Sequence, residues 1–228
     1  KPSNPGWRGV RQVTAPIAAI IMASGYSRRM GRNKLLLPLG GGTVIGAVLD
    51  LVATMDYAVV AVVSQYDEIL ALAAERGMRP VANRAAAQGK SGSIQVGVAA
   101  LSELTTAGLC PQPAGIIFFT GDQIHLNKAL LTRLQNAFIR RPTRIVFPSY
   151  GGKIGSPAIF PADLAPRLAA LRGEEGGMKV AAEQKERIWR VPVPAAQAWR
   201  GLDFDTWDDW LRSSALWADK AGDPGRQA

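Results

Sequence analysis

The chain has very few of the side chains on which disulfide and transition-metal chemistry depends. It contains one cysteine, Cys110, and one histidine, His125, in 228 residues. A single cysteine excludes an internal disulfide framework and a cysteine-rich zinc site, and it is typical of a reducing compartment. A single histidine also argues against a histidine-based metal site. We therefore expect a cytoplasmic protein whose chemistry uses carboxylates, basic side chains, hydroxyls and backbone groups.

Long apolar runs and continuous basic blocks are also missing. The apolar run Ile17–Met22 is far shorter than a membrane span and leads into charged residues. The net charge of +9 comes from lysines and arginines scattered along the chain, which suits anionic small molecules as well as nucleic acid. Because the apolar runs are short, we expect no membrane partner. Because the basic residues are not interleaved with aromatic ones, we expect no nucleic-acid partner.

The length of the chain and its content of 47% hydrophobic residues are sufficient to bury one large core. We predict a single domain over residues 17–217, preceded by a linker or tail at 1–16 and followed by a disordered tail at 218–228. The chain begins "KPSNPGW" with no initial Met. This permits the hypothesis that it is the C-terminal part of a larger protein.

Short apolar runs alternate with segments of helical period, a pattern that predicts an α/β fold with a mainly parallel sheet covered by helices on both faces. The predicted strands are Ile17–Met22, 58–63, Arg79–Ala82, Gly115–Thr120, 144–148, 158–160 and Ile188–Val193. The predicted helices are 44–55, 67–76, 93–104, 128–138, 161–171, 177–185 and 206–216. In such sheets ligands bind at the carboxyl ends of the strands, so the residues after each strand are the ones to inspect.

The last predicted helix has a clear start signal and an aromatic stripe. Thr206 is a candidate N-cap, and an aspartate three residues later forms an acidic variant of the capping box. Trp207, Trp210, Leu211 and Trp217 fall roughly on one helical face. We expect this stripe to pack into the core rather than to form an aromatic binding surface.

The first strand leads into a loop, "ASGYSRRMGRNKLLLP" at residues 23–38, that combines backbone freedom with positive charge. Gly25 and Gly31 allow tight turns, and Arg28, Arg29 and Lys34 supply charge-assisted donors for phosphate oxygens. The loop has neither the G-x-G-x-x-G pattern nor the Gly-Lys-Ser/Thr ending of a P-loop. It predicts a phosphate-binding loop, and the alternative is an ordinary solvated basic turn.

Two other segments carry carboxylates in positions that suit a hard cation. Asp122 directly follows the predicted strand Gly115–Thr120, and Asp203 and Asp205 stand two residues apart in "GLDFDTWDD". If that segment is extended, both of its carboxylates point to the same face. Mg²⁺ is bound by such oxygens together with substrate phosphates. The alternative is that Asp122 and Asp205 serve as turn or helix-capping residues.

Taken together, these segments resemble the molybdenum-cofactor nucleotidyltransferases, closest to the cytidylyltransferase branch. "IMASGYSRRMGRNKLLLPL" is similar to the family pattern L-A-A-G-x-S-x-R-M-G-x-x-K. "NRAAAQGKSGSIQVGVAAL", "GDQIHL", "GSPAIFP", "GEEGGMK" and "LDFDTWDDW" resemble its later segments in the same order. The resemblance covers about residues 17–211 and implies a three-layer sandwich with a Rossmann-like sheet, the nucleotide-diphospho-sugar transferase fold. It also implies that a larger protein containing this chain would carry a fused molybdopterin-handling domain.

The activity implied is Mg²⁺-dependent transfer of a nucleotidyl group from an NTP, with CTP expected, to the terminal phosphate of molybdopterin or the molybdenum cofactor. The implied catalytic residues are Arg29, Lys34 and Asp122, and the implied metal ligands are Asp122 and Asp205 with Asp203 as the substitute. The implied nucleotide-binding residues are Ala23, Ser24, Gly25, Ser27, Arg28, Arg29, Gly31, Lys34, Asn83, Gly89 and Ser93. The implied acceptor-binding residues are Gly155, Ser156, Pro157, Glu174, Gly176 and Lys179.

The departures from the family pattern lie mainly on the acceptor side. Ser156 replaces the usual histidine, Glu174 the usual aspartate and Lys179 the usual arginine, and Lys lacks the planar fork with which Arg binds phosphate. Ile124 and Trp207 each replace a proline, and Asp208 replaces a glutamate. Three alternatives stay open. They are a cytidylyl-, guanylyl- or uridylyltransferase for another acceptor such as a sugar phosphate, a non-catalytic molybdopterin carrier, and a maturation partner of a molybdoenzyme.

Overall fold

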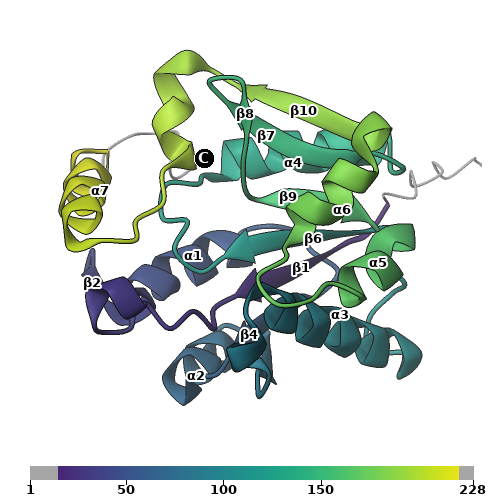
Figure 1. The fold of residues 1–228 in the computed structure, drawn as a ribbon, viewed down its shortest axis with the longest axis horizontal. Coiled ribbons are helices and arrows are strands. Elements are labelled where there is room, and N and C mark those ends of the chain that lie inside the picture. The colour runs from purple at the N-terminus through teal and green to yellow at the C-terminus, as the bar shows by residue number, and fades with distance from the viewer. Residues whose placement is uncertain (1–14, 221–228) are drawn as a thin grey trace, which may run out of the picture.

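The computed structural model describes residues 15–220 and contains an eight-stranded sheet in the order β10-β7-β9-β6-β1-β4-β5, with β8 paired to β7 (Figure 1). The strands are β1 Ile17–Met22, β4 Val60–Ser64, β5 Arg79–Ala82, β6 Gly115–Thr120, β7 Ile145–Tyr150, β8 Lys153–Ile154, β9 Ala158–Pro161 and β10 Ile188–Val193. Neighbouring strands run parallel except β9 and β8, whose pairings are antiparallel. The expected mainly parallel sheet is confirmed.

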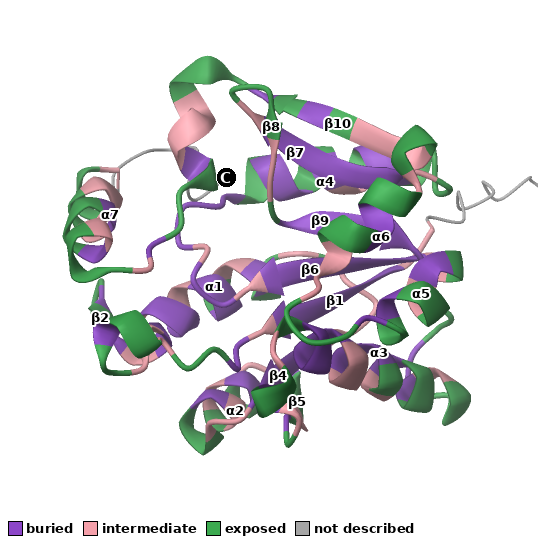
Figure 2. Ribbon diagram, in the orientation of Figure 1, coloured by how far each residue is buried: buried purple, intermediate pink, exposed green. Residues whose placement is uncertain are grey.

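Helices cover both faces of the sheet. They are α1 Val44–Ala53, α2 Asp67–Glu75, α3 Lys90–Thr106, α4 Lys128–Arg140, α5 Ala165–Ala169, α6 Gly177–Glu183 and α7 Trp207–Asp219. Alternate residues of β1 enter two separate buried clusters because side chains alternate along a strand. Ile17, Ala19 and Ile21 pack with α1, α2 and α4, whereas Ala18 and Ile20 pack with α3, α5 and α6. Figure 2 shows the resulting buried central layer between helices with exposed outer faces.

Several predicted boundaries were wrong. Helix α3 begins at Lys90, three residues before the prediction. The predicted helix 161–171 is a 3-10 turn, Ala162–Leu164, followed by the short α5, because Pro166 occupies the first turn of an α-helix most easily and resets the helix start there. The 3-10 segment Ala195–Gly201 was not predicted.

Two short hairpins were also missed. β2 Pro38–Leu39 pairs with β3 Gly42–Thr43, and β8 returns along β7. Each turn contains a Gly-Gly pair with positive φ at both residues, Gly40 and Gly41 in the first and Gly151 and Gly152 in the second. This is the backbone requirement of a type I′ hairpin turn, and the Gly-Gly pair was the available sequence signal.

Helix α7 begins as predicted but packs differently. Thr206 is its N-cap, and the capping box with Asp209 is present. Trp210 is buried and Trp217 packs against the core, but Trp207 is 39% exposed and Leu211 63% exposed. The expectation that the whole stripe packs inward was wrong, because α7 lies at the margin of the molecule and only part of its surface meets the core (Figure 1).

The predicted terminal segments are mostly outside the described residues. Of the predicted linker 1–16 only residues 15 and 16 are described, and of the predicted tail 218–228 only residues 218–220. Helix α7 continues to Asp219, two residues into that tail. Among residues 15–220, none of the helices combines the length and apolar character needed to cross a membrane.

Candidate active site

Loops at the carboxyl ends of three neighbouring strands meet at one edge of the sheet. β1 pairs in parallel with β4 on one side and with β6 on the other, so the loops that follow them emerge together. A fourth segment, residues 202–206, connects the 3-10 turn Ala195–Gly201 to α7 and reaches the same place. It is irregular rather than a strand, and Phe204 anchors it in the core between two aspartates.

The loop after β1 is held by its own hydrogen bonds and by two buried side chains. Ser27 has a left-handed φ of 50°, and its hydroxyl accepts a hydrogen bond from the amide of Lys34 at 3.1 Å. Met30 and Leu35 are buried in the core and anchor both halves of the loop. In the described part of the chain, the backbone amides of residues 24–27 donate no hydrogen bond to a backbone carbonyl. They are donors of the kind that binds phosphate.

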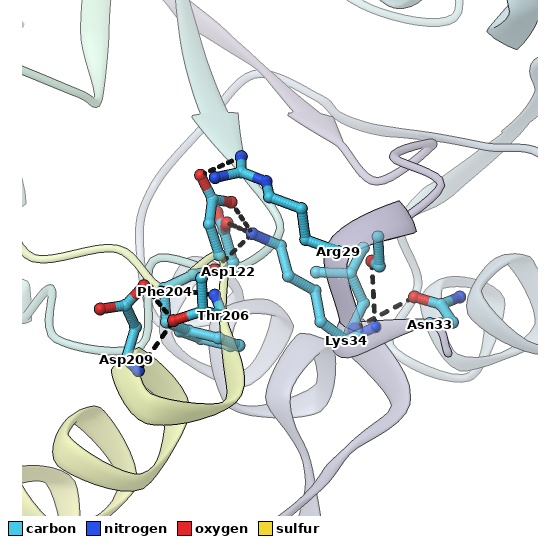
Figure 3. A network of polar contacts seen from close by, with 10 residues as sticks. Arg29, Asn33, Lys34, Asp122, Phe204, Thr206 and Asp209 are labelled. Atoms are coloured by element: carbon cyan, nitrogen blue, oxygen red, sulfur yellow. Dashed lines mark hydrogen bonds and ion pairs between the residues drawn. The ribbon is translucent and has the colours of Figure 1, made fainter. Parts of the chain in front are cut away.

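Lys34 is the centre of the site (Figure 3). Its Nζ donates to Asp122 Oδ2 at 2.6 Å, to Asp205 Oδ1 at 2.8 Å and to the carbonyl oxygen of Phe204 at 2.6 Å, so all three ammonium hydrogens are used. The side chains of Lys34 and Asp122 are only 14% and 12% exposed. Desolvation alone would lower the pKa of Lys34, but the charges and hydrogen bonds of the two aspartates outweigh it and raise that pKa.

A second cation and a third carboxylate complete the group. Arg29 Nη2 donates to Asp205 Oδ2 at 2.7 Å, and the hydrogen bond from Lys34 is the main cause that lowers the pKa of Asp205. Desolvation of its carboxyl group, assisted by the negative charges of Asp122 and Asp205, raises the pKa of Asp203. We refer to Arg29, Lys34, Asp122, Asp203 and Asp205 as the lysine–carboxylate cluster.

The carboxylates of this cluster are ligands of the type that magnesium prefers, although they are not grouped as a preformed metal centre in the described residues. Asp122 Oδ1 is buried and has no hydrogen-bond partner. Mg²⁺ is commonly held by one or two carboxylates while phosphates and waters complete its shell. Within residues 15–220, no group of three or more His, Cys, Asp or Glu is arranged as a metal centre. A cation already lies between two of the carboxylates, because the ammonium of Lys34 bridges Asp122 and Asp205.

Three of the predicted nucleotide-binding residues form a buried chain beneath the loop. Asn83 Nδ2 donates to Ser24 Oγ at 2.9 Å and to Ser93 Oγ at 3.1 Å, and Asn83 Oδ1 accepts from the amide of Ala85 at 2.9 Å. All three residues are buried. The structure therefore brings them together, but inside the protein, where their polar groups serve the loop. The amide of Ala23 is likewise engaged, by the carbonyl of Val63.

Of the other predicted nucleotide-binding residues, Arg29 and Lys34 belong to the lysine–carboxylate cluster, and the rest lie in the loop after β1 or, for Gly89, in the loop after β5. Gly25 is exposed, Gly31 has a positive φ of 69°, and Arg28 is exposed with its guanidinium 5.3 Å from the ring centroid of Tyr26. Gly89 is farther along the chain and also has a positive φ, of 79°. A Cβ at residue 89 would lie 2.5 Å from Glu174 Oε1. The loop at 89 therefore touches the predicted acceptor turn at 173–177.

The predicted acceptor residues form two separate turns. In the first, Ser156 accepts a hydrogen bond through its carbonyl from the Tyr150 hydroxyl at 3.1 Å, and Gly155 lies against the Tyr150 ring. Pro157 follows Ser156 through a cis peptide bond. Gly176, in the second turn, is the N-cap of α6. We refer to residues 155–157 and 173–179 as the acceptor turns.

Lys179 is the basic residue of the second acceptor turn. Its Nζ donates to Glu175 Oε1 at 2.5 Å, and this hydrogen bond is the main cause that raises the pKa of Lys179. Both side chains are partly exposed, at 50% and 34%. The two acceptor turns share no hydrogen bond or ion pair within the described residues.

Sequence reasoning missed three residues of the site. Gln65 Nε2 donates to the carbonyl of Ser24 at 2.6 Å, and the Tyr66 hydroxyl donates to the carbonyl of Gly25 at 3.1 Å. Both follow the carboxyl end of β4, so the rule that points to strand ends would have found them. The third is Phe204, whose backbone carbonyl binds Lys34. Nothing in the type of that residue signals this contact.

Known proteins show the same architecture. The model of the MobA-like NTP transferase domain family matches residues 19–188. The crystal structure of a Mycobacterium tuberculosis Rv0371c homologue from Mycobacterium sp. strain JC1 is 26% identical, with a TM-score of 0.73 over 91% of this chain and 99% of that one. Rv0371c in complex with manganese, from Mycobacterium tuberculosis H37Rv, is 25% identical, with a TM-score of 0.67 over 88% and 98%.

A curated relative adds a short but strong local match. The probable molybdenum cofactor guanylyltransferase of Mycobacterium tuberculosis H37Rv is 60% identical over 30 residues, which are 13% of this chain and 15% of that protein. The match therefore spans a small part of the relative's length. The family match, in contrast, covers most of the residues that form the sheet. The chain belongs to the MobA-like NTP transferase domain family and is a nucleotidyltransferase with the nucleotide-diphospho-sugar transferase fold.

Proposed function

We propose that this nucleotidyltransferase transfers the nucleotidyl group of an NTP, CTP in the first place, to the terminal phosphate of molybdopterin or of its molybdenum form. Pyrophosphate is released, and Mg²⁺ is the cofactor. The lysine–carboxylate cluster carries the proposal. It unites a basic loop, which can bind a triphosphate, with carboxylates, which can hold a metal, at the edge of the sheet where ligands bind.

Asp122 and Asp205 would hold Mg²⁺, with Asp203 as the substitute. The bound ion would supply neutralisation of the charge that develops on the phosphate oxygens. In this proposal Lys34 changes partners: its ammonium leaves the carboxylates, which would hold the metal, and donates to phosphate oxygens of the triphosphate. Arg29, whose side chain is 68% exposed, makes a similar change from Asp205 to the triphosphate.

The acceptor needs no activation by a protein base. A phosphate monoester is already ionised at neutral pH and attacks the α-phosphorus directly, so the protein's task is to hold two anions in line. This is consistent with the position of His125, which is buried and only 1% exposed. The amides of residues 24–27 and the side chains of Arg29 and Lys34 orient the donor in this scheme, and the acceptor turns orient the acceptor.

GTP is a second candidate for the nucleotide. The curated relative that matches 30 residues of this chain is named a probable molybdenum cofactor guanylyltransferase. On the acceptor side, the exposed Lys179 and Ser156 in place of arginine and histidine leave room for another phosphorylated acceptor, such as a sugar phosphate.

Pyrophosphate release tests the proposal directly. The purified protein is supplied with CTP, GTP, ATP or UTP, each with molybdopterin or with a sugar phosphate, in the presence of Mg²⁺. We expect pyrophosphate release with molybdopterin and CTP. A preference for GTP would change the assigned nucleotide from CTP to GTP and leave the proposed reaction the same. If no nucleotide reacts with molybdopterin but one reacts with a sugar phosphate, the acceptor assignment is wrong.

A further inference from the structure

A buried polar group lies behind the lysine–carboxylate cluster and is not part of it. His125 Nε2 and Ser213 Oγ are 2.7 Å apart, and Arg200 Nη1 donates to the carbonyl oxygen of His125 at 3.1 Å. The exposed fractions of these residues are 1%, 4% and 3%. We refer to His125, Arg200 and Ser213 as the polar node.

The polar node joins three segments that are distant in sequence. His125 follows β6, Arg200 belongs to the 3-10 segment Ala195–Gly201, and Ser213 lies in α7. Trp199 packs against two members, with its ring centroid 5.4 Å from that of His125 and 4.5 Å from the guanidinium carbon of Arg200. Because polar groups in a dry interior lose much when a partner is removed, such a node fixes the relative positions of its segments.

Each of these segments leads directly to a carboxylate of the cluster. His125 is three residues after Asp122, Arg200 is three residues before Asp203, and α7 begins two residues after Asp205. The node therefore connects the loop of Asp122 with the segment that carries Asp203 and Asp205. Lys34 also connects them, because it bridges Asp122 and Asp205.

These two connections differ in what happens when the metal site is occupied. In the proposed function, Asp122 and Asp205 would hold the metal in place of the Lys34 ammonium, so the Lys34 bridge would be lost when metal is bound, with or without nucleotide. The polar node contacts neither the metal nor the phosphates and can persist. Groups that orient metal ligands from behind commonly have a large effect on metal affinity.

We propose that the polar node positions Asp122 relative to Asp203 and Asp205 and thereby sets the affinity of the site for a divalent cation. His125, Arg200 and Ser213 are positioning residues, since they touch neither substrate nor metal. The inference rests on the proposed function, because it requires that these carboxylates hold the metal. Its consequence is that substitutions in the node weaken metal binding without removing any ligand.

A Mn²⁺ titration with no nucleotide present tests the inference. Electron paramagnetic resonance measures the concentration of free Mn²⁺ at each step and so gives the affinity of the protein for the ion. Ser213→Ala removes one hydroxyl from α7, and alanine is compatible with a helical backbone. Ser214→Ala is the matched control, because Ser214 is the next residue of the same helix and its hydroxyl donates only locally, to the carbonyl of Leu211 at 3.2 Å. We expect Mn²⁺ binding to weaken by about 10-fold in Ser213→Ala and to be unchanged in Ser214→Ala.

A second pair of variants separates positioning from stability. His125→Gln keeps a polar group able to reach Ser213, whereas His125→Leu removes it, so Gln is expected to retain more of the affinity for Mn²⁺. Thermal unfolding is recorded for every variant. Loss of thermal stability in Ser213→Ala and His125→Leu with the affinity of wild type would overturn the inference and leave the node a purely structural element. Absence of Mn²⁺ binding by the wild-type protein would overturn the metal assignment and the inference together.

Discussion

The lysine–carboxylate cluster and the acceptor turns are built in opposite ways. In the cluster, the paired side chains of Lys34 and Asp122 are 14% and 12% exposed, and Lys34 has three oxygen partners. In the acceptor turns, Lys179 and Glu175 form a single pair whose side chains are 50% and 34% exposed. Buried, multiply bonded charges are fixed in position, whereas an exposed pair in one helical turn is screened by water and easily separated.

This difference coincides with the departures from the family pattern. The residues of the cluster match the pattern that this chain resembles, whereas Ser156, Glu174 and Lys179 replace other residues in the acceptor turns. Replacing one member of a buried charge network leaves its partners as unpaired charges in the protein interior. Replacing a member of an exposed pair leaves a partner that water still solvates. The lysine–carboxylate cluster is therefore constrained by its own packing, whereas the exposed acceptor turns are free to change.

Among substitutions in the lysine–carboxylate cluster and the acceptor turns, Asp122→Asn is expected to lower activity most. It removes a carboxylate charge that faces Lys34 and, in the proposed function, a metal ligand. We expect the rate of pyrophosphate release at saturating substrates to fall on the order of 10³-fold. Asp50→Asn is the control, since Asp50 also pairs with a basic residue, Arg76, but at the surface. Equal losses in both variants would show that the cluster has no special role.

Lys34→Met separates the two roles of the cluster. Without its ammonium, Asp122 loses its ion-pair partner and Asp205 keeps only Arg29, so divalent-cation binding in the absence of nucleotide is expected to tighten. Nucleotidyl transfer is expected to fall on the order of 10²-fold in kcat/KM, because a donor to the phosphates is lost. Mn²⁺ titration and steady-state kinetics measure the two effects. Weaker Mn²⁺ binding in this variant would contradict the exchange of Lys34 between carboxylate and phosphate.

Lys179→Ala tests the acceptor side. If Lys179 contacts the acceptor phosphate, the KM for the acceptor rises by about 10-fold while the KM for the NTP stays unchanged. Lys179→Arg keeps the positive charge and is expected to retain most of the acceptor affinity. Thermal stability should change little, because the pair with Glu175 is exposed. A rise in the KM of the NTP instead would place Lys179 on the nucleotide side.

The smallest expected effect concerns the helix that follows the cluster. The hydrogen bond from Thr206, followed by that from Arg212, lowers the pKa of Asp209 to about 2 from the ordinary value of 3.8. The folded protein thus binds this proton less tightly than the unfolded chain, so the stabilisation is complete above about pH 4 and is lost as the pH falls toward 2. An NMR titration measures this pKa, and Thr206→Val should raise it.

Much of the fold was predictable because its signals are local. The seven predicted strands all correspond to strands of the sheet, and the signal was clearest for the buried central strands β1 and β6, which read as continuous apolar runs. The N-cap at Thr206 was predicted because capping depends on residues three apart. The break in the helix predicted at 161–171 and the two Gly-Gly hairpins were missed, although Pro166 and the Gly-Gly pairs were visible in the sequence.

The site was predictable in outline but not in its contacts. The basic loop, Asp122 and Asp205 do meet: the first two follow strand ends, as predicted, and the role of Asp205 beside them was implied by the family resemblance. The burial of Asn83 and the carbonyl of Phe204 that binds Lys34 were not foreseen. Side-chain burial depends on what packs above a residue, and a backbone carbonyl has no sequence signature.

By itself, the sequence determined which segments become strands, which loop is basic and which carboxylates follow strands, because periodicity, glycine and charge act over a few neighbouring residues. Only the tertiary structure decided that Lys34 contacts Asp205, 171 residues away, and that His125 meets Ser213, 88 residues away. Such contacts are set by the order of strands in the sheet and by the packing of α7. They are therefore a property of the folded chain as a whole.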